Sequence, residues 1–362
     1  MFFSPRSLLV SILLSLSMGA SGAEKAPDPI DAGLRQQYLR PTATPYPGDD
    51  PYSPAKEALG RTLFFDRLLS GSGTHSCATC HSPSLSFGDR LPRAVGDAGR
   101  PMAVRSPTLL DVAFIDRYGW TGKFPTLEKV SFAPIMAAGN LNLTEQALIA
   151  RLSAQAVYVK AFAQVFPDKK IDRENISAAL ATYVRSIHST QAPFDHWIMG
   201  DEAAVSPAAK RGFAIFNGKG NCAQCHSGWS FTDGSFHDIG VGKGKDIGRG
   251  AFFPTSVKLR YAFKTPTLRN VAERGPYMHD GSVGTLEAVI DLYNSGGVDR
   301  PSRSELIHPL GLSANEKSDL LAFLRTLSGH TEIVSLPAAC ALNAPCFSKS
   351  VGAPFQPKQA PK

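Results

Sequence analysis

Two short motifs of cysteine and histidine are the residues of this sequence best suited to chemistry. The first reads CATCH at residues 77–81 and the second reads CAQCH at residues 222–226. Two thiols separated by two residues can add to the two vinyl groups of one haem, and the adjacent histidine can then bind the haem iron. A structural zinc site is the alternative for a single motif, because cysteine pairs with histidine also suit tetrahedral zinc.

The two motifs lie in two copies of one sequence repeat. The matching segments are SPAKEALGRTLFF at 53–65 with SPAAKRGFAIF at 206–216, and SPTLLDVA at 106–113 with TPTLRNVA at 265–272. The second pair is offset by 159 residues, the difference between positions 106 and 265. Such self-similarity indicates a duplicated unit, with its boundary near residues 190–205. A motif repeated in this way disfavours zinc, so we predict two covalent haem c groups. The attachment residues are Cys77, Cys80, Cys222 and Cys225, and the iron ligands are His81 and His226.

The offset of 159 residues also shows what each copy places opposite its haem. It pairs Tyr293 with Pro134 and His279 with Trp120. A tyrosine phenolate can bind ferric iron, whereas proline has no side-chain donor atom. We therefore predict that Tyr293 is a ligand of the second haem, and that the haem of His81 stays open on the side of Pro134.

Helical periodicity dominates between the proline-rich ends of the chain. Apolar residues recur at helical spacing over residues 143–166, 171–187 and 313–327, and few segments read as strands. The prediction is a mainly α fold with long loops. We expect an N-terminal haem domain over residues 53–200 and a C-terminal one over residues 201–330.

The two ends of the chain are expected to lie outside these domains. Residues 1–23 place one arginine before a short apolar run and small residues, which predicts a signal peptide cleaved near Ala23 and a periplasmic protein. The run is shorter than the roughly 20 residues of a spanning helix, so no membrane span is expected in the mature chain. Residues 24–52 read as an extended proline-rich leader, ordered only where it packs on a domain, and residues 331–362 read as a tail. In an exported protein, Cys340 and Cys346 of that tail favour a local disulfide.

The formal charge of +7 is modest and spread along the chain. It resembles no nucleic-acid footprint, and a basic face of this kind could attract an acidic protein partner.

The sequence resembles the bacterial dihaem cytochrome c peroxidase family from about residue 53 to residue 330. The segments that carry the resemblance are LGRTLFFD, CATCHSP, SPTLLDVAF, CAQCHSG, FKTPTLRNVAERGPYMHDGSVGTLEAV and LSANEKSDLLAFLRTL. The resemblance implies two cytochrome c-like haem domains related by duplication. It further implies that the N-terminal haem reacts with hydrogen peroxide, that the C-terminal haem is six-coordinate, and that Trp120 lies between them.

The distal ligand of the second haem places the sequence in a subgroup of this family. Ordinary members carry methionine fourteen residues after the histidine of HDG, and MauG-like members carry tyrosine; counting from His279 leads to Tyr293. A tyrosinate ligand favours higher oxidation states of iron. Met278 is the alternative ligand, although it lies outside the family's ligand slot. The loop over residues 82–105 has no histidine to cap the first iron, so the resemblance implies a five-coordinate first haem.

The sequence departs from the family in the distal pocket of the first haem. Asn140 occupies the slot of the catalytic glutamate, and Val130 that of the MauG-like glutamine. An amide cannot move a proton between the peroxide oxygens at neutral pH, although it can orient peroxide or water by hydrogen bonding. Trp120, Pro134 and Asn140 are thus the candidate catalytic residues, with Asn140 suggesting slow peroxide turnover.

The family's calcium site also departs from the pattern. Arg105 and Arg274 occupy ligand positions, and guanidinium groups repel a hard dication. We therefore expect no calcium. For Arg269, a contact with a haem propionate is a hypothesis, because a guanidinium can pair with a carboxylate.

Together these residues predict a periplasmic dihaem oxidoreductase of the MauG-like type. Hydrogen peroxide would react at the first haem, and oxidising equivalents shared with the second haem would oxidise a protein partner. Two alternatives remain open. The first is an ordinary peroxidase that reduces peroxide to water with electrons from a small cytochrome or cupredoxin. The second is a non-enzymatic electron carrier or sensor.

Overall fold

The structure is a computed structural model that describes Met1 and residues 30–97 and 99–329. The predictions for the signal peptide, the tail from residue 331, and Cys340 with Cys346 lie outside the described residues. None of the helices in the described part combines the length and the apolar character needed to cross a membrane.

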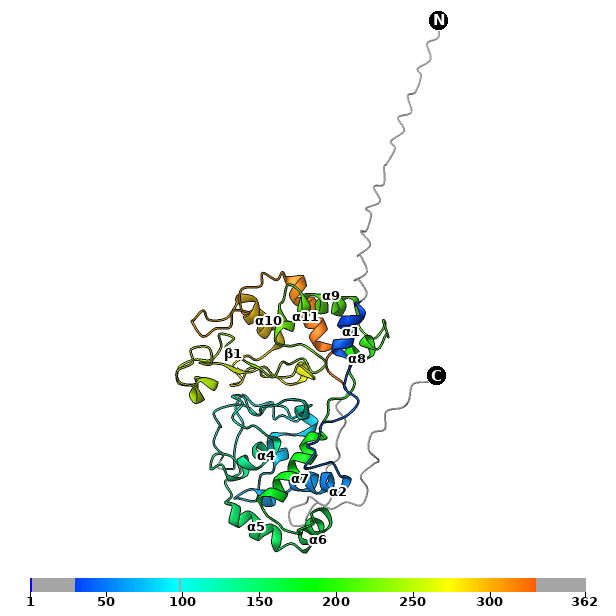
Figure 1. The fold of residues 1–362 in the computed structure, drawn as a ribbon. Coiled ribbons are helices and arrows are strands. Elements are labelled where there is room, and N and C mark those ends of the chain that lie inside the picture. Colours follow the sequence, from blue (N-terminus) through cyan, green and yellow to red (C-terminus); the bar gives the residue numbers. More distant parts are fainter. Residues whose placement is uncertain (2–29, 98, 330–362) are drawn as a thin grey trace, which may run out of the picture.

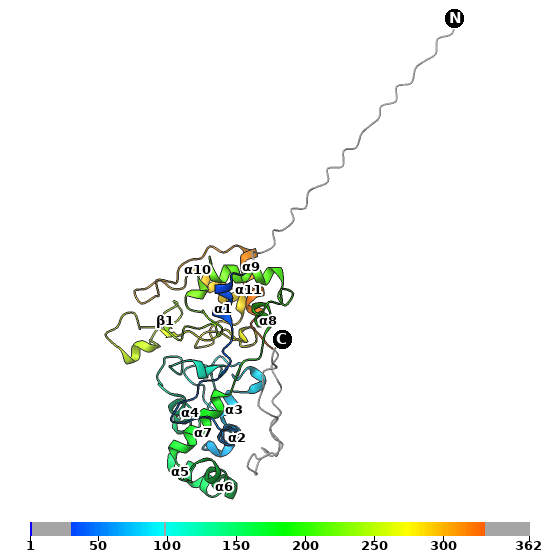
Figure 2. The ribbon, with the colours of Figure 1, turned by 45° about the vertical axis from the view of Figure 1, so that its right-hand side comes forward.

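Helices and long loops form two halves, one above the other in Figures 1 and 2. The first half holds α2 (Pro54–Phe65), α3 (Cys77–Cys80), α4 (Leu127–Met136), α5 (Glu145–Ser153), α6 (Ala156–Val165) and α7 (Arg173–Arg185). The second half holds α8 (Pro193–Ile198), α9 (Pro207–Asn217), α10 (Leu286–Ser295), α11 (Ala314–Arg325) and an antiparallel pair of short strands, β1 (Phe236–His237) and β2 (Phe263–Lys264). The prediction of a mainly α fold with long loops is confirmed.

Short 3-10 turns complete the described chain. They are η1 (Arg67–Leu69), η2 (Pro83–Leu85), η3 (Val112–Phe114), η4 (Cys222–Gln224), η5 (Arg249–Phe252) and η6 (Val271–Glu273). One further helix, α1 (Ala32–Tyr38), lies in the segment that we expected to be extended. The ring of Tyr38 packs in the hydrophobic core of the second half, and this burial accounts for the order of the segment.

The boundaries of two predicted helical runs agree with the structure, and a third run differs. Asp172 and Ser313 cap α7 and α11 by accepting hydrogen bonds from backbone N–H groups, as their positions before the apolar runs suggest. The run over residues 143–166 forms two helices, because Gln155 is extended between α5 and α6. This break lets Leu148 on α5 and Phe162 on α6 enter the same core.

Each half has its own core, built around one close helix crossing. In the first half α2 packs on α7, and a Cβ atom on Gly60 would lie 1.9 Å from the carbonyl oxygen of Ala179. In the second half α9 packs on α11, and a Cβ on Gly212 would lie 2.0 Å from the carbonyl oxygen of Asp319. Only glycine permits these backbones to approach so closely.

The repeat offset of 159 residues holds in three dimensions. Isolated bridges join Tyr118 to Phe124 in the first half and Tyr277 to Val283 in the second. After each bridge a threonine caps a helix: Thr126 begins α4 and Thr285 begins α10. The two helices are therefore equivalent elements, and Pro134 and Tyr293 occupy the same position along them.

Candidate haem sites

The first motif forms one helical turn that orients its histidine. The cysteines of α3 are separated by a single turn, and the N–H of His81 donates to the carbonyl oxygen of Cys77 at 3.0 Å. The Nδ1 atom of His81 lies 3.1 Å from the carbonyl oxygen of Phe87. A carbonyl can only accept, so Nδ1 carries the proton and Nε2 keeps a lone pair for a metal.

The second motif repeats this arrangement. The N–H of His226 donates to the carbonyl oxygen of Cys222 at 2.9 Å, and its Nδ1 lies 2.9 Å from the carbonyl oxygen of Phe231. Burial lowers the pKa of both His81 and His226 below the usual value, which favours the neutral imidazole that ligates metals. In both motifs the histidine is therefore neutral and has Nε2 free to bind a metal.

The donor set at each motif fits a covalent haem. The cysteines at 77, 80, 222 and 225 are free thiols. A cavity of about 240 Å³ is lined by Cys222, Cys225 and His226 and so offers apolar space beside the second motif. The zinc alternative lacks support, because the metal-ligand cluster found among the described residues joins Cys225 to Asp233 and His237 and leaves His226 out.

Both candidate distal ligands of the second haem lie at this cavity. Tyr293 on α10 and Met278 line it together with His226. Burial, and then the neighbouring Cys222 and Cys225, raises the pKa of Tyr293 above its usual value. The buried phenol therefore stays neutral unless a cation such as ferric iron stabilises the phenolate.

Pro134 and Asn140 lie in one segment of the first half, away from this cavity. Pro134 is inside α4, which ends at Met136, and its carbonyl oxygen accepts from the N–H of Leu141 at 3.1 Å. The carbonyl oxygen of Asn140 accepts from the N–H of Asp97 at 2.7 Å. The segment that follows α4 is thereby fixed to the loop that follows the first motif.

Trp120 lies where the two halves meet. Its Nε1 donates to the carbonyl oxygen of Arg105 at 2.9 Å, and its carbonyl oxygen accepts from the N–H of Lys264 in the second half at 2.8 Å. The indole also lines the cavity of the second motif. The structure therefore brings Trp120 together with His226 and Tyr293.

The two arginines at the expected calcium positions interact directly. The guanidinium of Arg105 donates to the carbonyl oxygen of Arg274 at 2.7 Å. Burial, and then the nearby Arg105, lowers the pKa of Arg274 to about 10, so the group remains cationic at neutral pH. The guanidinium of Arg105 thus already occupies the carbonyl oxygen of Arg274, which calcium would need as a ligand. The absence of calcium stays a prediction.

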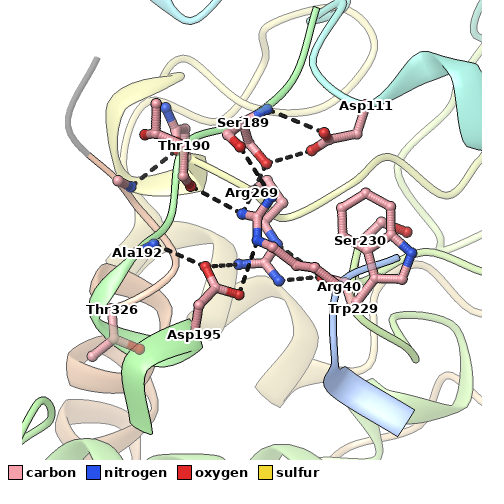
Figure 3. Close-up of polar contacts among 12 residues, drawn as sticks. Arg40, Asp111, Ser189, Thr190, Ala192, Asp195, Trp229, Ser230, Arg269 and Thr326 are labelled. Carbon is pink, nitrogen blue, oxygen red and sulfur yellow. Dashed lines mark hydrogen bonds and ion pairs between the residues drawn. The ribbon is translucent and has the colours of Figure 1, made fainter. Parts of the chain in front are cut away.

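Arg269 has a full set of protein partners for its guanidinium group. Its side chain is fully buried, and Nη1 donates to Asp195 at 2.8 Å while Nε donates to the carbonyl oxygen of Trp229 at 2.7 Å. Figure 3 shows this guanidinium between Asp195 and Trp229, with Arg40 beside it. The third nitrogen also donates to the carbonyl of Trp229. Arg269 therefore ties loops of the fold together, and its contact with a haem propionate stays a hypothesis.

One residue at the cavity was not singled out from the sequence. His279 is buried, stacks on Phe263 with ring centroids 3.6 Å apart, and lies 2.9 Å from a carboxylate oxygen of Asp246. It lines the same cavity as Trp120. The pairing of His279 with Trp120 at the repeat offset was the signal that could have identified it.

Comparison with known proteins decides the family. The family model "Di-haem cytochrome c peroxidase" matches residues 54–203. The methylamine utilization protein MauG of Methylorubrum extorquens is 47% identical over 308 residues, which cover 84% of this chain and 87% of that protein. The chain belongs to the di-haem cytochrome c peroxidase family.

Other members of the di-haem cytochrome c peroxidase family show the same relationship. The cytochrome-c peroxidase IdrP1 of Denitromonas iodatirespirans is 34% identical over 78% of this chain and 84% of its own length. A crystal structure of a MauG-like protein associated with microbial copper homeostasis aligns with a TM-score of 0.75 at 31% identity, over 81% of this chain and 94% of that chain. As a di-haem cytochrome c peroxidase, the chain is a peroxidase-type oxidoreductase with two covalently bound haem c groups.

Proposed function

We propose that this chain is a MauG-like oxidoreductase, which uses hydrogen peroxide at the site of His81 and oxidises a protein partner. The observation that carries the proposal is the asymmetry of two equivalent helices. At the same position, α4 has Pro134 and α10 has Tyr293. One site therefore has no side-chain donor at this position, while the other has a phenol.

The side chains around the two motifs have distinct roles in this proposal. When bound, the haems supply redox-active iron, open to peroxide in the first half and able to store an oxidising equivalent in the second. His81 and His226 would each bind the iron through Nε2, because a backbone carbonyl accepts a hydrogen bond from Nδ1. Tyr293 would be the second protein ligand in the C-terminal half, and its phenol, neutral when no cation is near, would bind iron as phenolate and release its proton to solvent.

In this proposal Asn140 contacts the peroxide and Trp120 takes part in electron transfer. The carboxamide of Asn140 can hold peroxide or water by hydrogen bonds but cannot carry a proton between oxygens. Reduction of one peroxide to two waters takes two protons and two electrons, and the partner protein supplies the electrons. Trp120, held by backbone groups of both halves, lies on the route that we assign to these electrons.

We further propose that the chain is exported to the periplasm and acts there on a protein partner. The N-terminal sequence over residues 1–23 supports export to the periplasm, where covalent haem attachment through CxxCH motifs takes place. The partner is a protein whose own side chain is oxidised. A small cytochrome or cupredoxin would be the partner if the chain were an ordinary peroxidase.

The test is to mix the oxidised holoprotein with one equivalent of hydrogen peroxide, without an electron donor, and to follow the haem absorption. We expect a change at both haems that persists and disappears when a reduced protein is added. Peroxide consumption that requires an added reduced cytochrome, with no persistent change, would support an ordinary peroxidase. An unchanged spectrum would support a carrier or sensor.

Two tyrosine variants of one cavity sharpen this test. Tyr293→Met places a thioether in the ligand slot and should shorten the lifetime of the spectral change. Tyr277→Phe is the matched control, because Tyr277 lines the same cavity but donates its hydroxyl to the carbonyl oxygen of Val271 at 3.0 Å. An equal effect of both variants would argue against a ligand role for Tyr293.

A further inference from the structure

A surface loop of the second half combines exposed aromatic and basic side chains. The segment between β1 and β2 projects from the second half in Figures 1 and 2 and includes η5. Phe252, Phe253 and Val257 on this loop are 48%, 44% and 57% exposed. Adjacent apolar side chains with this exposure are typical of an interaction site, since scattered exposed residues do not gather in this way.

The same loop also carries exposed basic side chains. Lys243, Lys245 and Arg260 are exposed, and within residues 30–97 and 99–329 no ion pair joins them to an acidic side chain. Lys258, by contrast, pairs with Glu305 at 2.7 Å. We refer to Lys243, Lys245, Phe252, Phe253, Val257 and Arg260 as the basic aromatic surface.

This surface is fixed to the segment of Trp120. Arg249 in η5 donates through Nη1 to the carbonyl oxygen of Thr121 at 2.7 Å. Gly122 has φ +65°, and a Cβ atom there would lie 2.7 Å from Nη1 of Arg249 and 2.2 Å from the ring of Phe236. The loop is therefore fixed through Arg249 to Thr121 and Gly122, the two residues that follow Trp120 in the chain.

The base of the loop borders the cavity of the second motif. Tyr261 and Phe263, which follow the exposed part of the loop, line that cavity together with Trp120 and His226. The loop is thus continuous in the chain with residues that line the cavity of Trp120 and His226. Electron exchange with a partner requires close approach to that cavity.

We propose that the basic aromatic surface docks an acidic protein, the redox partner of the proposed function on which this inference rests. The unpaired cations attract an acidic surface, and Phe252 and Phe253 supply the apolar centre that such an interface buries. Anionic lipid would attract the same cations. A bilayer, however, contains no redox group to place beside Trp120, so the position of the loop favours a protein.

The test measures binding of two small redox proteins to the holoprotein by titration calorimetry at low and at physiological salt. The probes are a small acidic cupredoxin and a small basic cytochrome c. Lys243→Glu/Lys245→Glu reverses two charges of the surface. Its matched control, Lys160→Glu/Lys170→Glu, makes the same change in net charge at exposed lysines of the first half.

We expect the wild type to bind the acidic probe, and the surface variant to lose about tenfold in affinity at low salt, because each reversed charge repels the partner. The control should stay within about twofold, as expected for charges outside an interface. Phe252→Ser should weaken binding at both salt concentrations, whereas Val159→Ser, at an exposed valine of α6, should not. The basic probe should bind weakly, and its affinity should be the same for the wild type and for every variant.

Several results would overturn the docking proposal. These are no binding of the acidic probe by the wild type, equal losses in the surface and control variants, or preference for the basic probe. Vesicles of anionic lipid that bind through the same lysines, while the acidic probe does not, would assign the surface to a membrane instead. The spectral response to peroxide is recorded on the same samples, and its absence with normal binding would contradict the proposed function alone.

Discussion

The indole Nε1 of Trp120 donates a hydrogen bond of 2.9 Å to the carbonyl oxygen of Arg105. The backbone N–H of Arg105 in turn donates to the carbonyl oxygen of His279 at 3.0 Å, and Lys264 donates to the carbonyl of Trp120. One aromatic ring is thus held at the boundary by hydrogen bonds that involve both halves. A fixed aromatic ring at this boundary suits the electron route that we propose between the two haem sites.

Trp120→Phe should separate the responses of the two haems. The variant loses one hydrogen bond, about 1 kcal/mol of stability, while both haems remain attached. After one equivalent of peroxide, we expect the spectral change at the second haem to be slowed or lost, as followed by rapid mixing. Trp197→Phe is the control, because its indole donates to Glu202 at 3.0 Å in the core of the second half. Similar kinetics in the two variants would contradict the assignment of Trp120.

The helix crossings predict two destabilised variants. Gly60→Ala and Gly212→Ala would each place a methyl group about 2 Å from a carbonyl oxygen, which the packed helices must move apart to admit. We expect losses of about 1–3 kcal/mol in urea unfolding of the holoprotein. Gly139→Ala, where a Cβ meets nothing within 4 Å, should stay within about 0.5 kcal/mol. Losses confined to one crossing would contradict their structural equivalence.

Asp111 predicts a stability that depends on pH. It is buried, and burial alone would raise its pKa; the contacts with His188, Arg40 and Ser189 outweigh burial and hold the pKa below its usual value. Asp111→Asn suits the backbone, since Asn270 has the same left-handed conformation at the repeat offset. The variant should lose about 1–3 kcal/mol at pH 7.

The sign of this pH dependence follows from the lowered pKa of Asp111. The charged carboxylate stabilises the fold above its unfolded pKa of about 3.9, and this contribution disappears as the pH falls through the lower folded value. The difference between wild type and Asp111→Asn in unfolding free energy should therefore shrink below about pH 4. A difference that stays constant down to that range would show that the charge is not responsible.

Metal analysis tests the arginine pair at the expected calcium position. Because Arg105 donates to the carbonyl oxygen of Arg274, we expect the purified holoprotein to contain no tightly bound calcium. Treatment with a chelator should leave the haem spectrum and the peroxide response unchanged. One equivalent of calcium per chain, lost together with the peroxide response, would contradict this expectation.

The sequence predicted the parts of the site that depend on local spacing. Each CxxCH motif holds the predicted attachment cysteines and the predicted ligand histidine within one short segment, and the offset of 159 residues pairs Pro134 with Tyr293 from the sequence alone. The caps of α7 and α11 were also readable, because a capping side chain contacts an N–H group only a few positions away.

The contacts that the sequence did not reveal join distant positions. Arg269 donates to Asp195 and to the carbonyl oxygen of Trp229, which are 74 and 40 residues away in the chain. These partners follow from the burial of the guanidinium in the folded chain. Arg249 contacts Thr121, which is 128 residues away, and so fixes the loop of the basic aromatic surface to the residue that follows Trp120. The break between α5 and α6 depends in the same way on the core that both helices share.

Electron paramagnetic resonance of the resting, fully oxidised holoprotein tests the central claim most directly. The account predicts one high-spin signal, from the site of His81, and one low-spin signal that changes in Tyr293→Met but persists in Met278→Leu. Two low-spin signals would show that both sites are closed by side chains. Loss of the low-spin signal in Met278→Leu, with no change in Tyr293→Met, would assign the ligand to sulfur and contradict the account.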